Sequence, residues 1–174
     1  EFKTKGRYPK LTDANEGWVK YQSHSGNSSI TSNAIAGFPN FVGGEVIIRK
    51  VPWILDKNAI TSQSSTTVGY TQFGQSTNPI DGYGFFFQNH PNACSQLGEW
   101  AYNSGSRKLT MHFGGGDPSG YTIDASTVQN LITVNNQQHI NFENLDLEGA
   151  NLNAFVFNFS SNLSIKYCDI KDIG

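Results

Sequence analysis

The sequence predicts an all-β fold: a right-handed parallel β-helix of few coils with a β-rich insertion that contains a hairpin. Two observations predict this fold. Residues 130–149 match residues 153–172 in pattern at a constant offset, and apolar residues alternate with polar ones inside each copy. Alternation with a period of two is typical of strands rather than helices.

Each copy has three short apolar bursts separated by polar residues and therefore predicts three short strands. A unit of about 23 residues with three short strands cannot bury its apolar face alone and normally stacks on further copies. In a parallel β-helix each copy is one coil, and equivalent residues form columns along the stack. The expected inward columns are Ile132 on Phe155, Val134 on Phe157, Phe142 on Ile165 and Leu147 on Ile170.

A further column should join Asn135 to Asn158 at a corner, because asparagine tolerates turn conformations and its amide can bond to an identical amide. Two other repeat folds fit less well. The Leu-x-x-Leu-x-Leu frame of leucine-rich repeats is missing, and a stretch resembling a pentapeptide repeat, residues 150–155, occurs once.

An earlier segment has the same spacing of strand patterns and corners as these coils. Residues 44–62 contain one strand pattern, a corner at residues 50–52 and a second strand pattern, and we interpret them as an early coil. The expected inward residues of this coil are Ile47, Trp53, Leu55 and Ile60. We therefore expect one β-helix unit, residues 1–174, made of an early coil (44–62), a β-rich insertion (63–125) and two regular coils (126–174).

Two elements stand out in the insertion. Residues 82–88 form a strand pattern too aromatic to be fully exposed. Residues 98–102 and 108–113 flank a polar, glycine-containing turn at residues 103–107, and this spacing predicts a β-hairpin.

The amino-acid composition indicates which classes of protein the chain could belong to. The 174 residues carry a formal net charge of -2, only 15% are charged, and no basic run occurs, which argues against nucleic-acid binding. Glycine and aromatic residues on a low-charge background are typical of an extracellular all-β domain, and no apolar run approaches membrane-spanning length. Residues 1–6 lack the apolar segment of a signal peptide, so we expect a mature or excised piece. Cys94 and Cys168 could be free or paired; a buried thiol is expected at Cys168.

Several segments together resemble one family. They are residues 6–9, residues 44–49 with Trp53, the Leu-Gly-Glu-Trp-Ala-Tyr stretch at residues 97–102 followed by Lys-Leu at 108–109, and residues 142–149. These segments are similar to secreted right-handed β-helix proteins of the pectate-lyase-like superfamily, of the type common in Bacteroidota, which include glycoside hydrolases and other polysaccharide-active proteins. The Gly-Glu-Trp hairpin is the most specific part of the resemblance.

The chain departs from the family pattern at Ala101, Asn103 and Thr110, where the hairpin usually has Tyr, Asp and an aromatic residue. Family members generally continue for many more coils and often carry their catalytic carboxylates further along. The resemblance therefore implies the N-terminal portion of a longer polysaccharide-active protein, incomplete as a catalyst.

Stacking at the repeat offset would place Asp146 beside Asp169 on the outer face, about 4.8 Å apart between strands. A retaining glycosidase needs two carboxyl groups about 5 to 5.5 Å apart, so the pair is a candidate catalytic site. Glu143, Glu148 and nearby lysines favour the alternative of a solvated charge ladder. Calcium remains an open ligand for this pair, although it would need about six to eight oxygen ligands. No other cofactor and no metal site are expected, because the four histidines lack metal-ligand spacing.

Aromatic side chains offer a second kind of site, because their flat apolar faces can stack on sugar rings. The candidate carbohydrate-binding residues are Trp100, Tyr102, Tyr83 and Tyr70, with Phe73 and Tyr121 as further aromatic residues of the insertion. We expect two or three of these rings at the surface and the rest in the core.

The leading hypothesis is an extracellular or cell-surface portion of a β-helix carbohydrate-active protein that recognises a polysaccharide or oligosaccharide. The first alternative is a small glycosidase or lyase that uses Asp146 and Asp169. The second is a structural or adhesive surface protein, because an open coil presents an unpaired strand edge to further coils of a parent protein or to a second chain.

Overall fold

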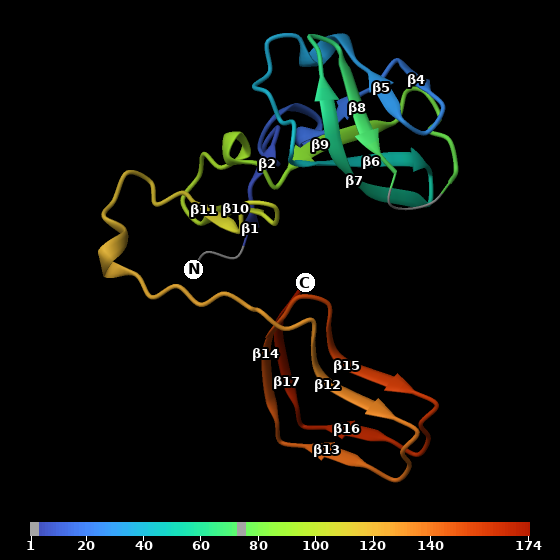
Figure 1. The fold of residues 1–174 in the computed structure, drawn as a ribbon, viewed down its shortest axis with the longest axis vertical. Helices are drawn as coiled ribbons and strands as arrows, with labels where there is room; N and C mark the ends of the chain where they lie inside the picture. The colour runs from blue at the N-terminus through green and yellow to red at the C-terminus, as the bar shows by residue number, and fades with distance from the viewer. Residues whose placement is uncertain (1–3, 73–75) are drawn as a thin grey trace. The chain divides into compact units, whose positions relative to one another are not determined.

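The computed structural model describes residues 4–72 and 76–174 (Figure 1). The chain is all-β, which confirms the predicted class. It divides into two compact units, Glu1–Pro118 and Ser119–Gly174, where the sequence predicted one β-helix unit. Short 3-10 turns interrupt the strands: η1 (Ala14–Gly17), η2 (Asn33–Ile35), η3 (Pro91–Ala93) and η4 (Pro118–Gly120). In the part of the chain that the structure describes, no helix has the length and apolar character needed to cross a membrane.

The first unit contains an eight-stranded antiparallel sheet. Its order is β2-β9-β6-β7-β8-β5-β4, with β3 also paired to β9. The strands are β2 (Arg7–Tyr8), β3 (Val19–Lys20), β4 (Ser23–Ser25), β5 (Ser29–Thr31), β6 (Glu45–Val51), β7 (Ile54–Gln63), β8 (Thr67–Thr71) and β9 (Gly84–Gln88).

A small second sheet completes this unit. It consists of β1 (Thr4–Lys5), β10 (Glu99–Asn103) and β11 (Lys108–Met111), with β1 parallel to β10 and β10 antiparallel to β11. The β10–β11 pair is the hairpin that the sequence predicted.

Residues 44–62 are not an early coil, which corrects the prediction. They form the antiparallel hairpin β6–β7, in which Val51 pairs with Ile54 across the two-residue turn Pro52-Trp53. Alternation of apolar residues predicts strands but not the direction of the next strand, so the pattern could not separate a coil from a hairpin. Ile60 is buried in the core as expected, and Ile47 is buried on the opposite face of the sheet, whereas Trp53 is 81% exposed and Leu55 59% exposed.

The boundary between coil and insertion also differs from the prediction, because β8 and β9 share the sheet of β6 and β7. The polar stretch at residues 23–31 supplies β4 and β5. Their cross-strand pairing includes Ile30, which is buried against Val68 of β8.

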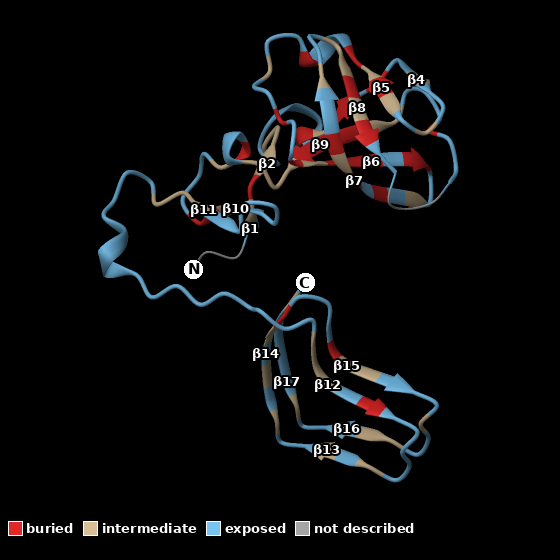
Figure 2. Cartoon of the chain, in the orientation of Figure 1, coloured by how far each residue is buried: buried red, intermediate tan, exposed pale blue. Residues whose placement is uncertain are grey.

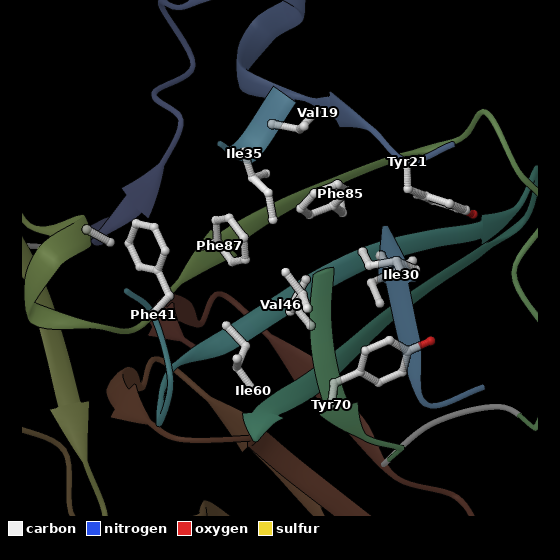
Figure 3. Packing of buried hydrophobic residues seen from close by; sticks show 13 residues of the cluster. Val19, Tyr21, Ile30, Ile35, Phe41, Val46, Ile60, Tyr70, Phe85 and Phe87 are labelled. Carbon is white, nitrogen blue, oxygen red and sulfur yellow. The ribbon is translucent and has the colours of Figure 1, made fainter. Parts of the chain in front are cut away.

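The core of the first unit lies on one face of the large sheet and is rich in aromatic side chains (Figure 3). Phe41 stacks on Phe87 with ring centroids 4.5 Å apart, and Phe85 packs edge-on to Phe87. Val19 and Ile35, from segments that precede the sheet's central strands, lie against the Phe85 and Phe87 side of this cluster. The core is thus closed by the N-terminal segments.

The second unit has three pairs of parallel strands. They are β12 (Asn130–Asn135) with β15 (Asn153–Asn158), β13 (Asn141–Glu143) with β16 (Ser164–Lys166), and β14 (Asp146–Ala150) with β17 (Asp169–Ile173). Every pair has the register that the repeat predicted, which confirms all four apolar columns. The predicted amide ladder is confirmed too, since Asn158 Nδ2 donates to Asn135 Oδ1 at 2.7 Å.

Burial differs between the units (Figure 2). Buried residues concentrate in β6, β8 and β9, whereas β12 to β17 are mostly exposed or half-buried. In the second unit Val134 is 7% exposed, but three of the four column residues of the later repeat, Phe157, Ile165 and Ile170, are each about 40% exposed, and Phe155 is half-buried. Cys94 and Cys168 are both half-buried free thiols.

Candidate functional site

The structure brings Asp146 and Asp169 together as predicted, since they are register partners in the parallel pair β14–β17. Both side chains are exposed. Lys171 Nζ lies 2.6 Å from Asp169 Oδ2, and this hydrogen bond, with the charges of Asp169, Asp146 and Glu148, raises the pKa of Lys171.

The neighbouring column pairs Glu143 with Lys166, whose Nζ lies 3.6 Å from Glu143 Oε1. The second unit therefore carries pairs of opposite charge in addition to the like-charged pair Asp146 and Asp169. Burial away from water is one way in which enzymes prepare a carboxyl group to act as a general acid, and both aspartates are exposed. The exposed, paired charges favour the alternative of a solvated charge ladder.

The four aromatic candidates have different environments. Tyr70 is 4% exposed and belongs to the core, which leaves its ring little surface on which a sugar could stack. Burial, helped by the charge of Asp56, raises the pKa of the Tyr70 phenol to about 12. Its strand β8 alternates buried and half-buried positions, and Tyr70 shares the buried face with Val68.

Tyr83 and Trp100 are half-buried, and each ring has a cation over it. The Arg49 guanidinium lies 5.6 Å from the Tyr83 centroid, and Lys5 Nζ lies 5.3 Å from the Trp100 centroid. Tyr102 is 43% exposed and is the ring among the four candidates that faces solvent most. Phe73 lies outside the described residues.

Tyr102 stands between two adjoining hollows of the first unit, which we call the Tyr102 hollows. Their volumes are about 400 and about 180 Å³. Both are lined by Gly43, Asn89, Tyr102 and Asn103. The larger hollow adds Glu45, Lys57 and the hairpin tip at Ser104 and Gly105; the smaller adds His90, Lys108 and Thr110.

Asn89 positions Tyr102. The Asn89 Oδ1 atom accepts a hydrogen bond from the Tyr102 backbone N–H at 2.8 Å, and Asn89 Nδ2 donates to Glu45 Oε1 at 3.1 Å. Asn89 has a left-handed backbone with φ 55, a conformation that asparagine adopts more readily than most residues. One side chain thus ties the β10–β11 hairpin to the end of β9 and the start of β6.

Glu45 contributes a carboxylate to the lining of the larger hollow. Its Oε2 atom accepts a hydrogen bond from Gln88 Nε2 at 2.7 Å and lies 3.7 Å from Lys5 Nζ. The carboxylate is therefore held in place by two amides and one ammonium group, and it remains partly exposed to the hollow.

The backbone approaches closely beneath the hollows. A Cβ added to Gly44 would lie 2.9 Å from His90 Cβ, so a larger residue would push β6 away from the end of β9. Burial lowers the pKa of His90, whose ring packs edge-on against Phe41. The imidazole is therefore favoured in its neutral form near pH 7, and its Nδ1 accepts from the Asn92 backbone N–H.

Sequence reasoning identified Tyr102 but missed Glu45, Lys57 and Asn89. The interpretation of residues 44–62 as a coil placed the first two in the wrong context. A usable signal existed at residues 88–91, where the polar Gln-Asn-His-Pro run directly follows an aromatic strand. Such a run at a strand end often carries functional side chains.

The hollows combine an exposed aromatic face, several amides, a fixed carboxylate and two ammonium groups. These groups can stack on a ring and exchange hydrogen bonds with hydroxyls. Within residues 4–72 and 76–174, no cluster of three or more His, Cys, Asp and Glu side chains could hold a metal ion. No family model, curated protein or solved structure matches the chain.

Proposed function

We propose that this chain is the polysaccharide-recognising portion of an extracellular β-helix carbohydrate-active protein and that it binds glycan at the Tyr102 hollows. The observation that carries the proposal is the exposed ring of Tyr102 between two hollows lined by amide and charged side chains. Glycan sites typically need both an apolar platform and a few placed polar groups.

The chemistry of the lining favours a sugar over an apolar ligand. Asn89, Asn103 and Glu45 offer hydrogen-bond acceptors, while Lys57 and Lys108 offer donors. The two hollows adjoin at Tyr102, which suits a polymer that spans both of them. The resemblance of residues 97–102 and 108–109 to the hairpin of β-helix polysaccharide-active proteins supports the same substrate class, and it concerns the hairpin that carries Tyr102.

We further propose that the second unit comprises two coils of a right-handed parallel β-helix. Support comes from three parallel strand pairs with one common register and from two side-chain ladders, Asn153 to Asn130 and Asn158 to Asn135. Stacked identical amides are expected where repeats align along an axis.

Glycan-array binding followed by titration calorimetry tests the recognition proposal. Wild-type chain should bind at least one polysaccharide, and Tyr102→Ala should weaken binding about tenfold or more, the usual effect of truncating a central aromatic contact. Tyr102→Phe keeps the ring and should retain most of the affinity. Tyr167→Ala is the matched control, since Tyr167 is an 83% exposed tyrosine of the second unit. Binding that survives Tyr102→Ala unchanged would place the glycan elsewhere.

Catalysis is tested in the same samples. Product release from a bound glycan that disappears in the double variant Asp146→Asn/Asp169→Asn would establish the glycosidase or lyase alternative. Binding without products supports a recognition module.

A further inference from the structure

The hairpin β6–β7 has an outer face that begins in the Tyr102 hollows. Glu45 pairs with Ala59, Ile47 with Lys57, and Arg49 with Leu55. Because side chains alternate along a strand, these six residues lie on one face, opposite the core face that carries Val46 and Ile48. Glu45, Lys57 and Ala59 line the larger hollow, so the hollow and this face are continuous.

The face ends at an exposed aromatic side chain. Trp53 lies in the turn of the hairpin and is 81% exposed, and Leu55 before Lys57 is 59% exposed. Its indole ring offers a large, flat apolar surface on which a sugar ring can stack. From Ala59 to Leu55 the strand rises about 14 Å, and the turn extends the face to roughly 20 Å. This length accommodates several linked sugar rings.

Two cations occupy the middle of this face. Lys57 is exposed and forms no ion pair among the described residues. The Arg49 guanidinium is exposed, donates to the Pro52 carbonyl and lies over Tyr83, so a carboxylate does not neutralise it either. Glu45, in contrast, is already held by Gln88, Asn89 and Lys5. The free charge along the face is therefore positive.

We propose that the outer face of β6–β7 extends the Tyr102 hollows to a second contact at Trp53, and that its ligand is an extended acidic glycan. This inference rests on the proposed glycan recognition and specifies its substrate class. Trp53 stacks on a sugar ring at one end, Tyr102 at the other, and Lys57 with Arg49 binds carboxylate or sulfate groups between them.

The test uses oligosaccharide series from disaccharide to octasaccharide on several backbones, each in neutral, uronate and sulfated form. Affinity should rise with length until both aromatic side chains are engaged, and acidic forms should bind more tightly than neutral forms of the same backbone. Trp53→Ala should lower the affinity for the longest acidic member about fivefold to tenfold and leave the shortest binders unchanged. Lys57→Glu should remove the preference for acidic forms, and added salt should weaken wild-type binding.

Two controls match these variants. Phe159→Ala removes a 92% exposed aromatic side chain of the second unit, and Lys166→Glu reverses an exposed lysine charge there. Both should bind like wild type. The uronate and sulfate arms identify which acidic group the cations prefer.

The outcomes separate the two proposals. If Tyr102→Ala abolishes binding while Trp53→Ala and Lys57→Glu change neither affinity, length dependence nor charge preference, the extended acidic site is wrong and glycan recognition stands. If only neutral glycans bind, the assignment of an acidic ligand is overturned. If no member of the panel binds, both proposals are overturned.

Discussion

The two units bury their apolar side chains in different ways. The first closes an aromatic core, with Phe85 and Phe87 fully buried beneath segments from distant parts of the sequence. The second aligns equivalent residues in columns, and Phe157 remains 38% exposed at the end of one column. A closed core needs contacts distant in sequence, whereas a stack needs only its neighbouring repeat. Stability in the first unit should therefore depend on single residues much more than in the second.

The two units also differ in how far their ion pairs are buried. The first unit buries ion pairs, with Lys50 fully buried against Asp56 and Lys10 nearly so against Glu99. In the second unit Lys171 and Asp169 are both more than half exposed. Buried pairs are costly to break because the remaining partner is left without compensation, whereas exposed pairs contribute little.

The largest expected effect is that of removing a core ring. Phe87→Ala should destabilise the first unit by about 3 to 5 kcal/mol, because the ring stacks on Phe41 and the space cannot collapse easily. Phe157→Ala, at an exposed column end, should cost only about 1 kcal/mol. All three tryptophans lie in the first unit, so tryptophan fluorescence during chemical denaturation reports that unit, and hydrogen exchange reports the second. Equal losses of unfolding free energy in Phe87→Ala and Phe157→Ala would contradict the contrast between the closed core and the stacked columns.

The next largest effect on stability should come from breaking the buried ion pair of Lys10 and Glu99. Burial by itself would raise the pKa of the Glu99 carboxyl, but hydrogen bonds from Lys10 and from the Ser95 and Gln96 backbone outweigh it, and the pKa lies below its usual value. A carboxyl pKa lowered by folding adds stability that is present above the unfolded value of about 4.3 and is lost as pH falls through the folded value.

Glu99→Gln should therefore cost about 3 kcal/mol at pH 7, because Lys10 remains buried, and the cost should shrink in acid. Urea denaturation from pH 7 to pH 3 measures both quantities. Glu16→Gln, at an exposed position of η1, is the control and should show little change at either pH. A pH-independent loss would show that packing, not charge, makes Glu99 important.

The contrast between units also explains what the sequence could reveal. In the second unit the repeat fixes each column, because Ile132 and Phe155 occupy equivalent places and parallel stacking leaves one register. The β10–β11 hairpin was predictable for a local reason, a polar turn between two alternating strands. In both cases the decisive contacts are those of a repeat or of adjacent strands.

The fold of the first unit depends on pairings between strands that are distant in the sequence, and local sequence patterns do not identify these partners. Strand β9 pairs with both β2 and β6, and nothing in the alternation of residues 84–88 identifies those partners. The turn at Pro52-Trp53 reverses the chain, so Trp53 points to solvent rather than into a coil. The Tyr102 hollows depend on Asn89, whose partners lie 13 and 44 residues away, so sequence reasoning found the ring but not its polar surroundings.

A smaller effect should come from the amide ladder. Asn158→Ala removes the hydrogen bond to Asn135 and should destabilise the second unit by about 0.5 to 1.5 kcal/mol, the usual net contribution of one hydrogen bond. Asn151→Ala changes an exposed asparagine outside the ladders and should have less effect. Hydrogen exchange of the β12 and β15 amides measures the difference between the two variants. If exchange becomes faster to the same extent in both, the amide ladder does not contribute specifically to stability.

The smallest effect on stability should come from the outer charges. Asp169→Asn removes the hydrogen bond that raises the pKa of Lys171, so that pKa should fall towards its usual value, as a titration of the lysine resonances by NMR would show. A lysine pKa raised by folding adds stability that is present below the unfolded value of about 10.4 and is lost as pH rises through the folded value. Because both groups are exposed, the unfolding midpoint at neutral pH should not change measurably, and glycan binding at the Tyr102 hollows should be retained. A catalytic or calcium-binding Asp146–Asp169 pair predicts the opposite: glycan cleavage lost in Asp169→Asn, or calcium that stabilises the wild type and not the variant. The variant therefore decides whether the regular face of the second unit is a solvated ladder or a site, while leaving the first unit intact as an internal reference.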